Sequence, residues 1–155
     1  MTTKRKIALD DIDYKILKEL SMDSEKGVKE IAEKIGIPVS TCFNRIKKLK
    51  ELGVIKRFTI SVDPSVIGYD VTAAIHLNVE GPYLEEIEKT LAENPNILYL
   101  YDITGEYDVL AIARFRSVEE LDKFIKGLLK NPKIKRTITN VILRVVKESD
   151  VKVPL

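Results

Sequence analysis

The chain has 155 residues with 26 Lys and Arg against 24 Asp and Glu, but residues 1–63 carry a net charge of +4 and residues 64–155 a net charge of −2. Its single Cys cannot form an internal disulfide and no apolar run is long enough to cross a bilayer, which excludes a disulfide-stabilised scaffold and an integral membrane protein. The length allows two domains, of which only the first attracts polyanions, and we expect cytoplasmic residence because we find no secretory signal.

Two short helices are predicted first. Leu9 to Leu20 has apolar residues at helical spacing and acidic residues in its first turn, where the helix dipole favours them. Val28 to Ile35 also has one apolar face, and Gly36 can take the left-handed conformation that ends it. We expect both helices to pack against a third.

The third helix, about Val39 to Leu52, has a different outer face. Its apolar residues Cys42, Ile46 and Leu49 can face a core. The other face carries polar residues at positions i, i+3, i+4 and i+7, namely Thr41, Asn44, Arg45 and Lys48. This pattern is typical of the recognition helix of a helix-turn-helix DNA-binding protein, although a basic face alone fits a solvated surface about as well.

The roles of these side chains follow from the chemistry of the major groove. Asn pairs with adenine and Arg with guanine, each pair discriminating by about 1–3 kcal/mol, whereas lysines mostly meet phosphates. Asn44 and Arg45 are therefore predicted to read bases, with an ion pair to an acid of the first helix as the alternative for Arg45. The predicted DNA-binding set is Ser40, Thr41, Asn44, Arg45, Lys47, Lys48, Lys56 and Arg57.

The segment after the third helix resembles a strand. Val54 to Val62 alternates apolar and polar residues until Asp63-Pro64, which predicts a wing or a linker. We accordingly expect a helix-turn-helix domain over 1–53, a β-strand linker over 54–70 and a second domain over 71–155.

The second domain is predicted to have the order strand, helix, strand, strand, helix, strand. This order is that of a ferredoxin-like fold with an antiparallel sheet, so the fold class of the chain is α+β. The predicted strands are Val71–Val79, Ile97–Thr104, Tyr107–Arg116 and Ile138–Lys147, and the predicted helices are Tyr83–Glu93 and Val118–Leu129.

The strands are more apolar than helices on one face of a sheet would require. In Ile97 to Tyr101 and Val109 to Ala113 the residues that point to either face are largely apolar. Because an uncovered apolar sheet is a liability, we infer a two-fold homodimer, with an unrelated protein as the alternative partner. Paired recognition helices would suit a pseudo-palindromic DNA site.

Catalysis has little support in this sequence. His76 is the only histidine and lies in a predicted strand, and Cys42 lies on the packed face of a helix. A carboxylate cluster of Asp102, Glu106 and Asp108 is conceivable, but a binding loop or solvated turn explains it more simply. We expect no enzyme activity, no catalytic residue, no metal and no cofactor.

Five segments of the chain, taken together, resemble the Lrp/AsnC family of leucine-responsive and asparagine-operon regulators, with an archaeal or thermophilic source suggested. They are Leu9–Leu17, Ser40–Leu49, Gly53–Ile55, Thr104–Val109 and Arg136–Thr139. The resemblance implies regulation of transcription, dimers that assemble into octamers, and a small effector, usually an amino acid, bound between dimers.

The resemblance also places an effector loop at Thr104 to Asp108. Gly105 would let the backbone approach a carboxylate, and Asp108 would accept from an α-amino group. The implied effector-binding residues are Tyr83, Thr104, Gly105, Glu106, Tyr107, Asp108, Thr137 and Thr139, the two threonines coming from a neighbouring subunit. On spacing alone, a plain hairpin turn explains the loop better.

These observations predict a homo-oligomeric, sequence-specific DNA-binding regulator that responds to a small effector. Two alternatives remain at this stage. One is an architectural protein that compacts DNA without sequence preference. The other is a metabolic sensor that acts on an enzyme through the C-terminal domain.

Overall fold

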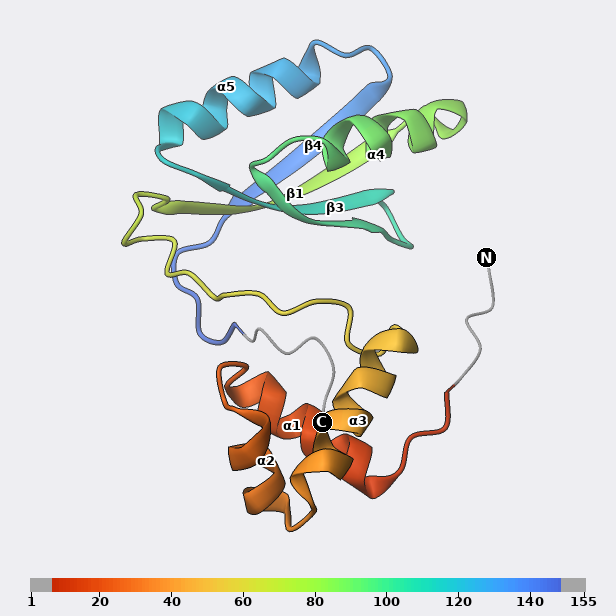
Figure 1. The fold of residues 1–155 in the computed structure, drawn as a ribbon. Helices are drawn as coiled ribbons and strands as arrows, with labels where there is room; N and C mark the ends of the chain where they lie inside the picture. The colour runs from red at the N-terminus through yellow and green to blue at the C-terminus, as the bar shows by residue number, and fades with distance from the viewer. Residues whose placement is uncertain (1–6, 149–155) are drawn as a thin grey trace. The chain divides into compact units, whose positions relative to one another are not determined.

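A computed structural model describes residues 7–148 of the chain (Figure 1). The chain divides into an N-terminal unit that ends at Ser61 and a C-terminal unit, Val62–Lys147, and each has its own hydrophobic core. The boundary falls inside the linker that we expected over residues 54–70. Within the described residues, no helix is both long and apolar enough to cross a membrane.

The N-terminal unit consists of three helices, α1 (Asp11–Met22), α2 (Val28–Ile35) and α3 (Val39–Glu51). Gly36 ends α2 with φ +74°, and the next N–H, of Ile37, donates to the carbonyl of Ala32. The helices pack around the buried residues Ile16, Ile31, Ala32, Cys42, Ile46 and Leu49. Burial raises the pKa of the Cys42 thiol, as expected for a packing residue.

The C-terminal unit is a four-stranded sheet with helices on one face (Figure 1). All neighbouring strands are antiparallel and their order is β2-β3-β1-β4, which is the ferredoxin-like arrangement. Its elements are β1 (Val71–Val79), a 3₁₀ turn η1 (Gly81–Tyr83), α4 (Leu84–Ala92), β2 (Ile97–Asp102), β3 (Val109–Phe115), α5 (Val118–Leu129) and β4 (Ile134–Val141). The predicted α+β fold is confirmed.

The strands alternate between a covered and an uncovered face. Along β1 and β3 every second residue is buried, including Ile75, Leu77 and Phe115. The intervening residues point away from the helices and are only partly buried, among them the apolar Leu110 and Ile112. Within one chain, the second face of the sheet is thus less completely covered than the first.

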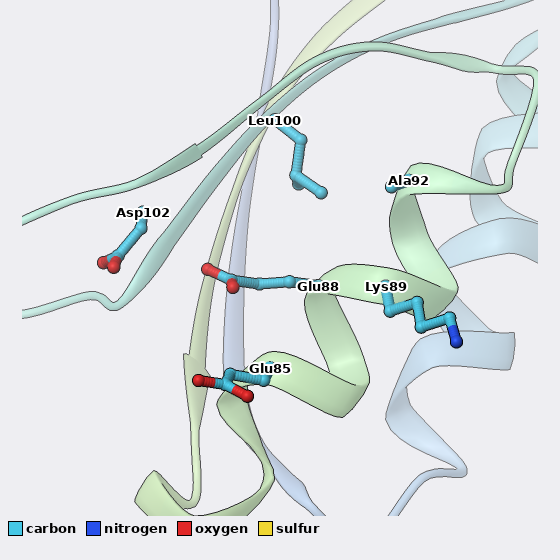
Figure 2. Close-up of a pocket in the computed structure, with 6 residues that line it drawn as sticks. All are labelled: Glu85, Glu88, Lys89, Ala92, Leu100 and Asp102. Carbon is cyan, nitrogen blue, oxygen red and sulfur yellow. The ribbon is translucent and has the colours of Figure 1, made fainter. Parts of the chain in front are cut away.

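A hollow between α4 and β2 gathers three carboxylates (Figure 2). Glu85 and Glu88 come from α4, and Asp102 comes from the end of β2. Burial, followed by the charges of Asp102 and Glu85, raises the pKa of Glu88. Asp102 therefore groups with acids of α4 that are close to it only in the folded chain.

The strands predicted over Ile97–Thr104 and Tyr107–Arg116 are each shorter by one or two residues at one or both ends, and two other predicted strands differ more. Residues 54–62 form no strand within the described chain, because a strand needs a neighbour for its N–H and C=O groups and this segment has none there. The last strand runs over Ile134–Val141 instead of Ile138–Lys147, since buried Ile134 already pairs with Val79. Lys135 and Arg136 concealed its start, but charged side chains are common on an edge strand.

Candidate DNA-binding helix and effector loop

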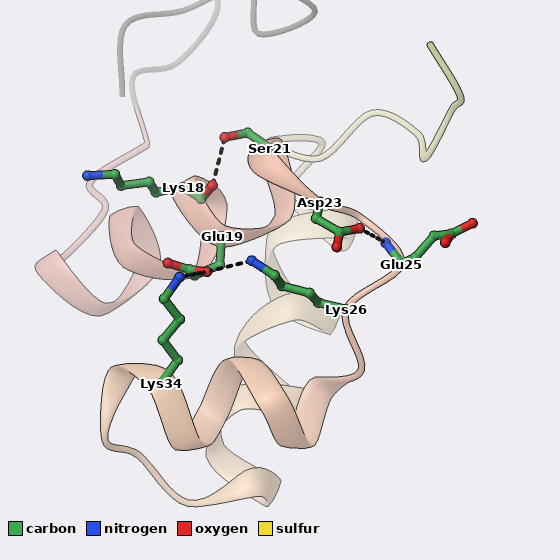
Figure 3. Close-up of polar contacts among 7 residues, drawn as sticks. All are labelled: Lys18, Glu19, Ser21, Asp23, Glu25, Lys26 and Lys34. Atoms are coloured by element: carbon green, nitrogen blue, oxygen red, sulfur yellow. Dashed lines mark hydrogen bonds and ion pairs between the residues drawn. The ribbon is translucent and has the colours of Figure 1, made fainter. Parts of the chain in front are cut away.

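A buried carboxylate holds the first two helices of the N-terminal unit together (Figure 3). Glu19 on α1 accepts hydrogen bonds from Lys34 Nζ on α2, at 2.7 Å, and from Lys26 Nζ in the loop between them, at 3.1 Å. The side chain of Glu19 is only 10% exposed. The two ammonium groups lower the pKa of Glu19. This network fixes α2, against which α3 packs.

Glu19→Gln is expected to lower the stability of the N-terminal unit at neutral pH. It should also reduce the further loss of stability when the pH is lowered. The pKa of Glu19 in the folded state lies below its ordinary 4.5, so its contribution is present above that pH and disappears as the pH falls through the lowered value. Thermal unfolding at pH 7 and pH 3 measures both effects. Glu33→Gln, at an exposed pair with Lys29, is the matched control and should change little. If Glu19→Gln loses as much stability between pH 7 and pH 3 as the wild type does, Glu19 is not the source of this pH dependence.

The outer face of α3 carries most of the predicted DNA-binding residues. Ser40, Asn44, Lys47 and Lys48 are exposed, whereas Thr41 is half-buried. Lys47 contacts Glu51 one turn along the helix at 3.9 Å, and both side chains remain about two-thirds exposed. These side chains are available to a ligand that approaches the helix from outside.

Arg45 does not belong to this available face. Its Nη1 donates to Asp10 Oδ2 and, at 3.0 Å, to Asp13 Oδ1, and its side chain is 29% exposed. The same two acids form the capping box of α1, in which the Asp13 N–H donates to Asp10 Oδ1 at 2.9 Å. We expected Arg45 to read bases. The structure gives it the alternative partner, the acidic start of the first helix, because α3 lies against that end of α1.

The chain after α3 stays attached to the end of the helix. The N–H groups of Val54 and Ile55 both donate to the carbonyl of Leu49, at 2.9 and 3.1 Å. Phe58 then lies beneath Lys50 Nζ, 4.7 Å from the ring centroid. The predicted phosphate contacts Lys56 and Arg57 are exposed within this short anchored segment. They thus follow α3 closely.

Sequence reasoning left two apolar residues of α3 without a role. Phe43 is 57% exposed and Val39 is 45% exposed, although both are hydrophobic. Neither belongs to the buried core of the unit or to the partly buried residues that pack against it. Helical periodicity gave a weak signal for them, since they fall outside the stripe of Cys42, Ile46 and Leu49.

The predicted effector loop is a hairpin tip clamped onto β1. The Asp108 N–H donates to the Leu77 carbonyl at 3.0 Å, and Asp108 Oδ2 accepts from the Val79 N–H at 2.8 Å. The Glu106 carbonyl accepts from Asn78 Nδ2 at 3.0 Å. One carboxylate oxygen of Asp108 therefore already helps to hold the loop on β1.

The tip of this loop has the backbone freedom that we expected. Gly105 has φ +120°, in the region that favours glycine, and both it and Thr104 are exposed. Glu106 pairs with Arg136 of β4 at 3.0 Å, and both side chains remain more than half exposed. The loop thus presents backbone and a carboxylate to solvent.

Tyr107 lies where the loop meets the uncovered face of the sheet. Its ring lies 5.6 Å from that of His76 on β1, and the guanidinium of Arg136 lies 5.6 Å from its centroid. Its hydroxyl and His76 Nδ1 are both buried, and among the described residues neither has a hydrogen-bond partner. Such atoms are costly unless something else supplies a partner.

The remaining predicted effector residues are distributed over two other elements. Thr137 and Thr139 of β4 lie opposite Leu77 and Ile75 and are half-buried. Tyr83 ends η1, and its ring packs beneath Lys133 Nζ at 4.4 Å. The structure thus brings Thr137 next to the strand that holds the loop, while the ring of Tyr83 is engaged with Lys133.

Both units match known families. Residues 9–56 match the winged helix-turn-helix DNA-binding family, and residues 72–151 match the Lrp/AsnC ligand binding domain. The two matches follow each other along the chain, one for each unit.

Curated relatives and solved structures agree with these matches. The chain is 43% identical over 140 residues to the uncharacterised HTH-type transcriptional regulator PH1692 of Pyrococcus horikoshii, covering 90% of this chain and 95% of that protein. It is 37% identical over 144 residues to the HTH-type transcriptional regulator FL11 of the same organism, covering 93% and 95%. The AsnC family transcriptional regulator from Agrobacterium tumefaciens superposes with a TM-score of 0.88 at 26% identity, covering 94% of this chain and 97% of that one.

Proposed function

The chain belongs to the Lrp/AsnC family of transcriptional regulators, and we propose that it binds specific operator DNA as an oligomer under the control of a small effector. One observation carries the proposal. A helix with exposed amide, hydroxyl and ammonium groups lies in the basic N-terminal unit and is joined to a family-matched ligand-binding domain. As a DNA-binding protein it acts in the compartment of the chromosome, which we take to be the cytoplasm.

The proposed division of labour on α3 separates readers from anchors. Asn44, with Ser40 and Thr41 beside it, supplies base-edge hydrogen bonds. The side chains that neutralise phosphates are Lys47, Lys48, Lys56 and Arg57. Arg45 instead positions α3 against α1, because its guanidinium is bonded to Asp10 and Asp13.

Lys48→Ala is expected to weaken binding to all DNA sequences alike and to reduce the salt dependence of binding. The slope of log affinity against log salt should fall by about one for each recognition helix, because one phosphate contact is lost. Fluorescence anisotropy between 50 and 300 mM KCl, roughly the range in which counterion release dominates, gives the slope. Lys126→Ala removes the same charge from an exposed position on α5 and should leave this slope unaltered. A changed base preference in Lys48→Ala would contradict the role as an anchor.

The proposed effector is an amino acid at the loop of Thr104 to Asp108. The exposed backbone around Gly105 suits a carboxylate, and exposed Glu106 suits an ammonium group. Asp108 keeps the loop on β1 through one oxygen and would accept from the ligand's ammonium group. Thr137, Thr139, Tyr83 and Tyr107 complete the proposed site, with the threonines supplied by a neighbouring subunit.

We further propose a two-fold dimer formed through the uncovered face of the sheet, with four dimers joining into an octamer. The support is the set of apolar side chains that the single chain leaves partly exposed on this face, namely Tyr101 at 48% and its neighbours Leu110 and Ile112 on β3. A dimer also gives two recognition helices for a pseudo-palindromic operator. Effector bound between dimers would change the relative placement of these helices, and operator DNA would reciprocally change effector affinity.

The test is selection of bound fragments from genomic DNA at near-physiological salt, followed by rebinding with each amino acid in turn. A short pseudo-palindromic consensus whose occupancy or oligomer pattern changes with one amino acid is the expected result. A consensus that is indifferent to every amino acid would remove the effector site and leave the regulator. The absence of any consensus would remove sequence-specific regulation itself.

A further inference from the structure

Phe43 lies as centrally on the exposed face of α3 as Asn44 does. An α-helix turns by about 100° per residue, so the exposed side chains from Val39 to Lys48 span about half of its circumference. Ser40 and Lys47 lie near the middle of that arc. Phe43 lies about 50° to one side of the middle and Asn44 about 50° to the other. A ligand that contacts Asn44 and Lys47 together therefore meets Phe43.

The exposure of Phe43 is unusual for its surroundings. Its 57% exposed ring lies among polar side chains, and Val39, one turn earlier on the same side of the helix, is 45% exposed. The hydrophobic core of the unit takes Cys42, Ile46 and Leu49 from α3, but neither of these two residues. Two neighbouring apolar side chains that stay exposed on a face that otherwise suits a polyanion would gain free energy by burial against an apolar group on the ligand.

The major groove of DNA contains one such group. Among the base edges exposed there, only thymine carries a methyl, and this methyl distinguishes it by apolar contact from the other bases. Phosphates and the remaining base edges offer charge or hydrogen bonds, which a phenyl ring does not use. The chemistry of Phe43 thus selects thymine.

We infer that Phe43, supported by Val39, is a specificity-determining residue that contacts the 5-methyl group of a thymine within one or two base pairs of the base read by Asn44. The inference rests on the proposed function, since it requires α3 to enter the major groove. It adds an apolar reader to the polar readers and predicts a thymine at a fixed place in each half-site.

Removal of single methyl groups from the DNA tests this contact without changing any hydrogen bond. The probe is the most tightly bound duplex selected by the full chain from a random-sequence library, with each thymine replaced in turn by deoxyuridine. One thymine per half-site should lose about fourfold in affinity on replacement, equivalent to one methylene left unburied. All other replacements should be neutral.

Protein variants then assign the methyl contact to one side chain. Phe43→Ala should bind the thymine and deoxyuridine duplexes equally, and Phe43→Leu should keep part of the difference. Tyr14→Ala removes a comparably exposed ring on α1, which is 50% exposed. This variant should keep the whole difference in affinity between the thymine and deoxyuridine duplexes. Thermal unfolding of each variant checks that the fold is intact, which the exposure of Phe43 favours.

The outcomes separate this inference from the proposed function. A selected consensus that is indifferent to deoxyuridine at every position would overturn the role of Phe43 while leaving the regulator in place. Unchanged discrimination in Phe43→Ala would also overturn it, and a uniform loss of affinity would assign the ring to a contact with another protein copy. Failure of the selection to yield any consensus would remove the proposed function, and the inference with it.

Discussion

Arg45→Ala is expected to destabilise the N-terminal unit and to weaken binding to every DNA sequence, with base preference unchanged. The substitution leaves Asp10 and Asp13 facing each other without their shared guanidinium, and the Asp13 side chain is only 12% exposed. Each carboxylate still accepts one backbone N–H in the capping box, but two neighbouring negative charges without a cation, one of them mostly buried, oppose folding. Because the same contact sets α3 against α1, the recognition helix loses its fixed position and all sequences are affected alike.

This result separates a positioning residue from a base reader. A reader would relax choice at one G·C pair by about 1–3 kcal/mol, whereas a positioning residue lowers affinity uniformly. Binding to the consensus duplex and to its single-base variants, together with thermal unfolding, makes the distinction. Asp10→Asn with Asp13→Asn in the Arg45→Ala background should regain stability. Lys47→Ala, which removes a cation from an exposed pair on the same helix, should cost little stability.

The pH dependence of stability gives a second readout of the same contact. The N–H of Asp13 and then the Arg45 guanidinium lower the pKa of Asp10 below its ordinary 3.8. This contribution is present above that value and is lost as the pH falls through the lowered pKa of the folded state. Arg45→Ala should therefore lose less stability than the wild type as the pH falls. An equal loss in both proteins would argue against the ion pair.

Local sequence patterns predicted the elements whose structure depends mainly on local interactions. The ranges Val28–Ile35, Val71–Val79 and Val118–Leu129 are found as predicted, because each combines a clear apolar period with a strong stop or start signal. Ser117 caps α5 by accepting from the Glu120 N–H. Such signals act within a few residues and need no knowledge of the tertiary fold.

The errors lie where structure depends on a distant partner. The alternation in residues 54–62 is that of a strand, but hydrogen-bond pairing decides whether a strand forms, and alternation does not encode the partner. The late start assigned to β4 has a related cause. Lys135 and Arg136 look like loop residues until Ile134 is seen to pair with Val79. Edge strands are the elements in which polarity is least informative.

The candidate sites divide in a similar way. Exposure of Asn44, Lys47 and Lys48 follows from helical periodicity and was predictable. The attachment of Arg45 to Asp10 and Asp13 joins residues more than 30 positions apart, and sequence offered it only as an alternative. The engagement of Asp108 with the Val79 N–H was not foreseen, because a carboxylate after a glycine turn reads equally well as a ligand contact.

Asn44→Ala is expected to relax base choice at one position of each half-site while retaining most of the affinity for unrelated DNA. Asn44 is exposed on the outer face of α3, and a carboxamide can donate to and accept from one adenine edge at once. Loss of this bidentate pair should reduce discrimination at that base pair by about 1–3 kcal/mol, which is roughly 5- to 150-fold in relative affinity. The salt dependence should stay that of the wild type, since no phosphate contact is removed.

The measurement is competitive binding of the consensus duplex against every single-base variant, at one fixed salt concentration, for the wild type, Asn44→Ala and Lys48→Ala. The two variants should differ in kind. Asn44→Ala should bind with similar affinity whichever base stands at one position of the half-site. Lys48→Ala should lower the affinity for every duplex by the same factor. If both variants weaken every sequence equally, the division of α3 into readers and anchors is wrong. The relaxed position should also lie within one or two base pairs of the thymine whose methyl is assigned to Phe43, because neighbouring residues of a helix in the groove reach neighbouring base pairs.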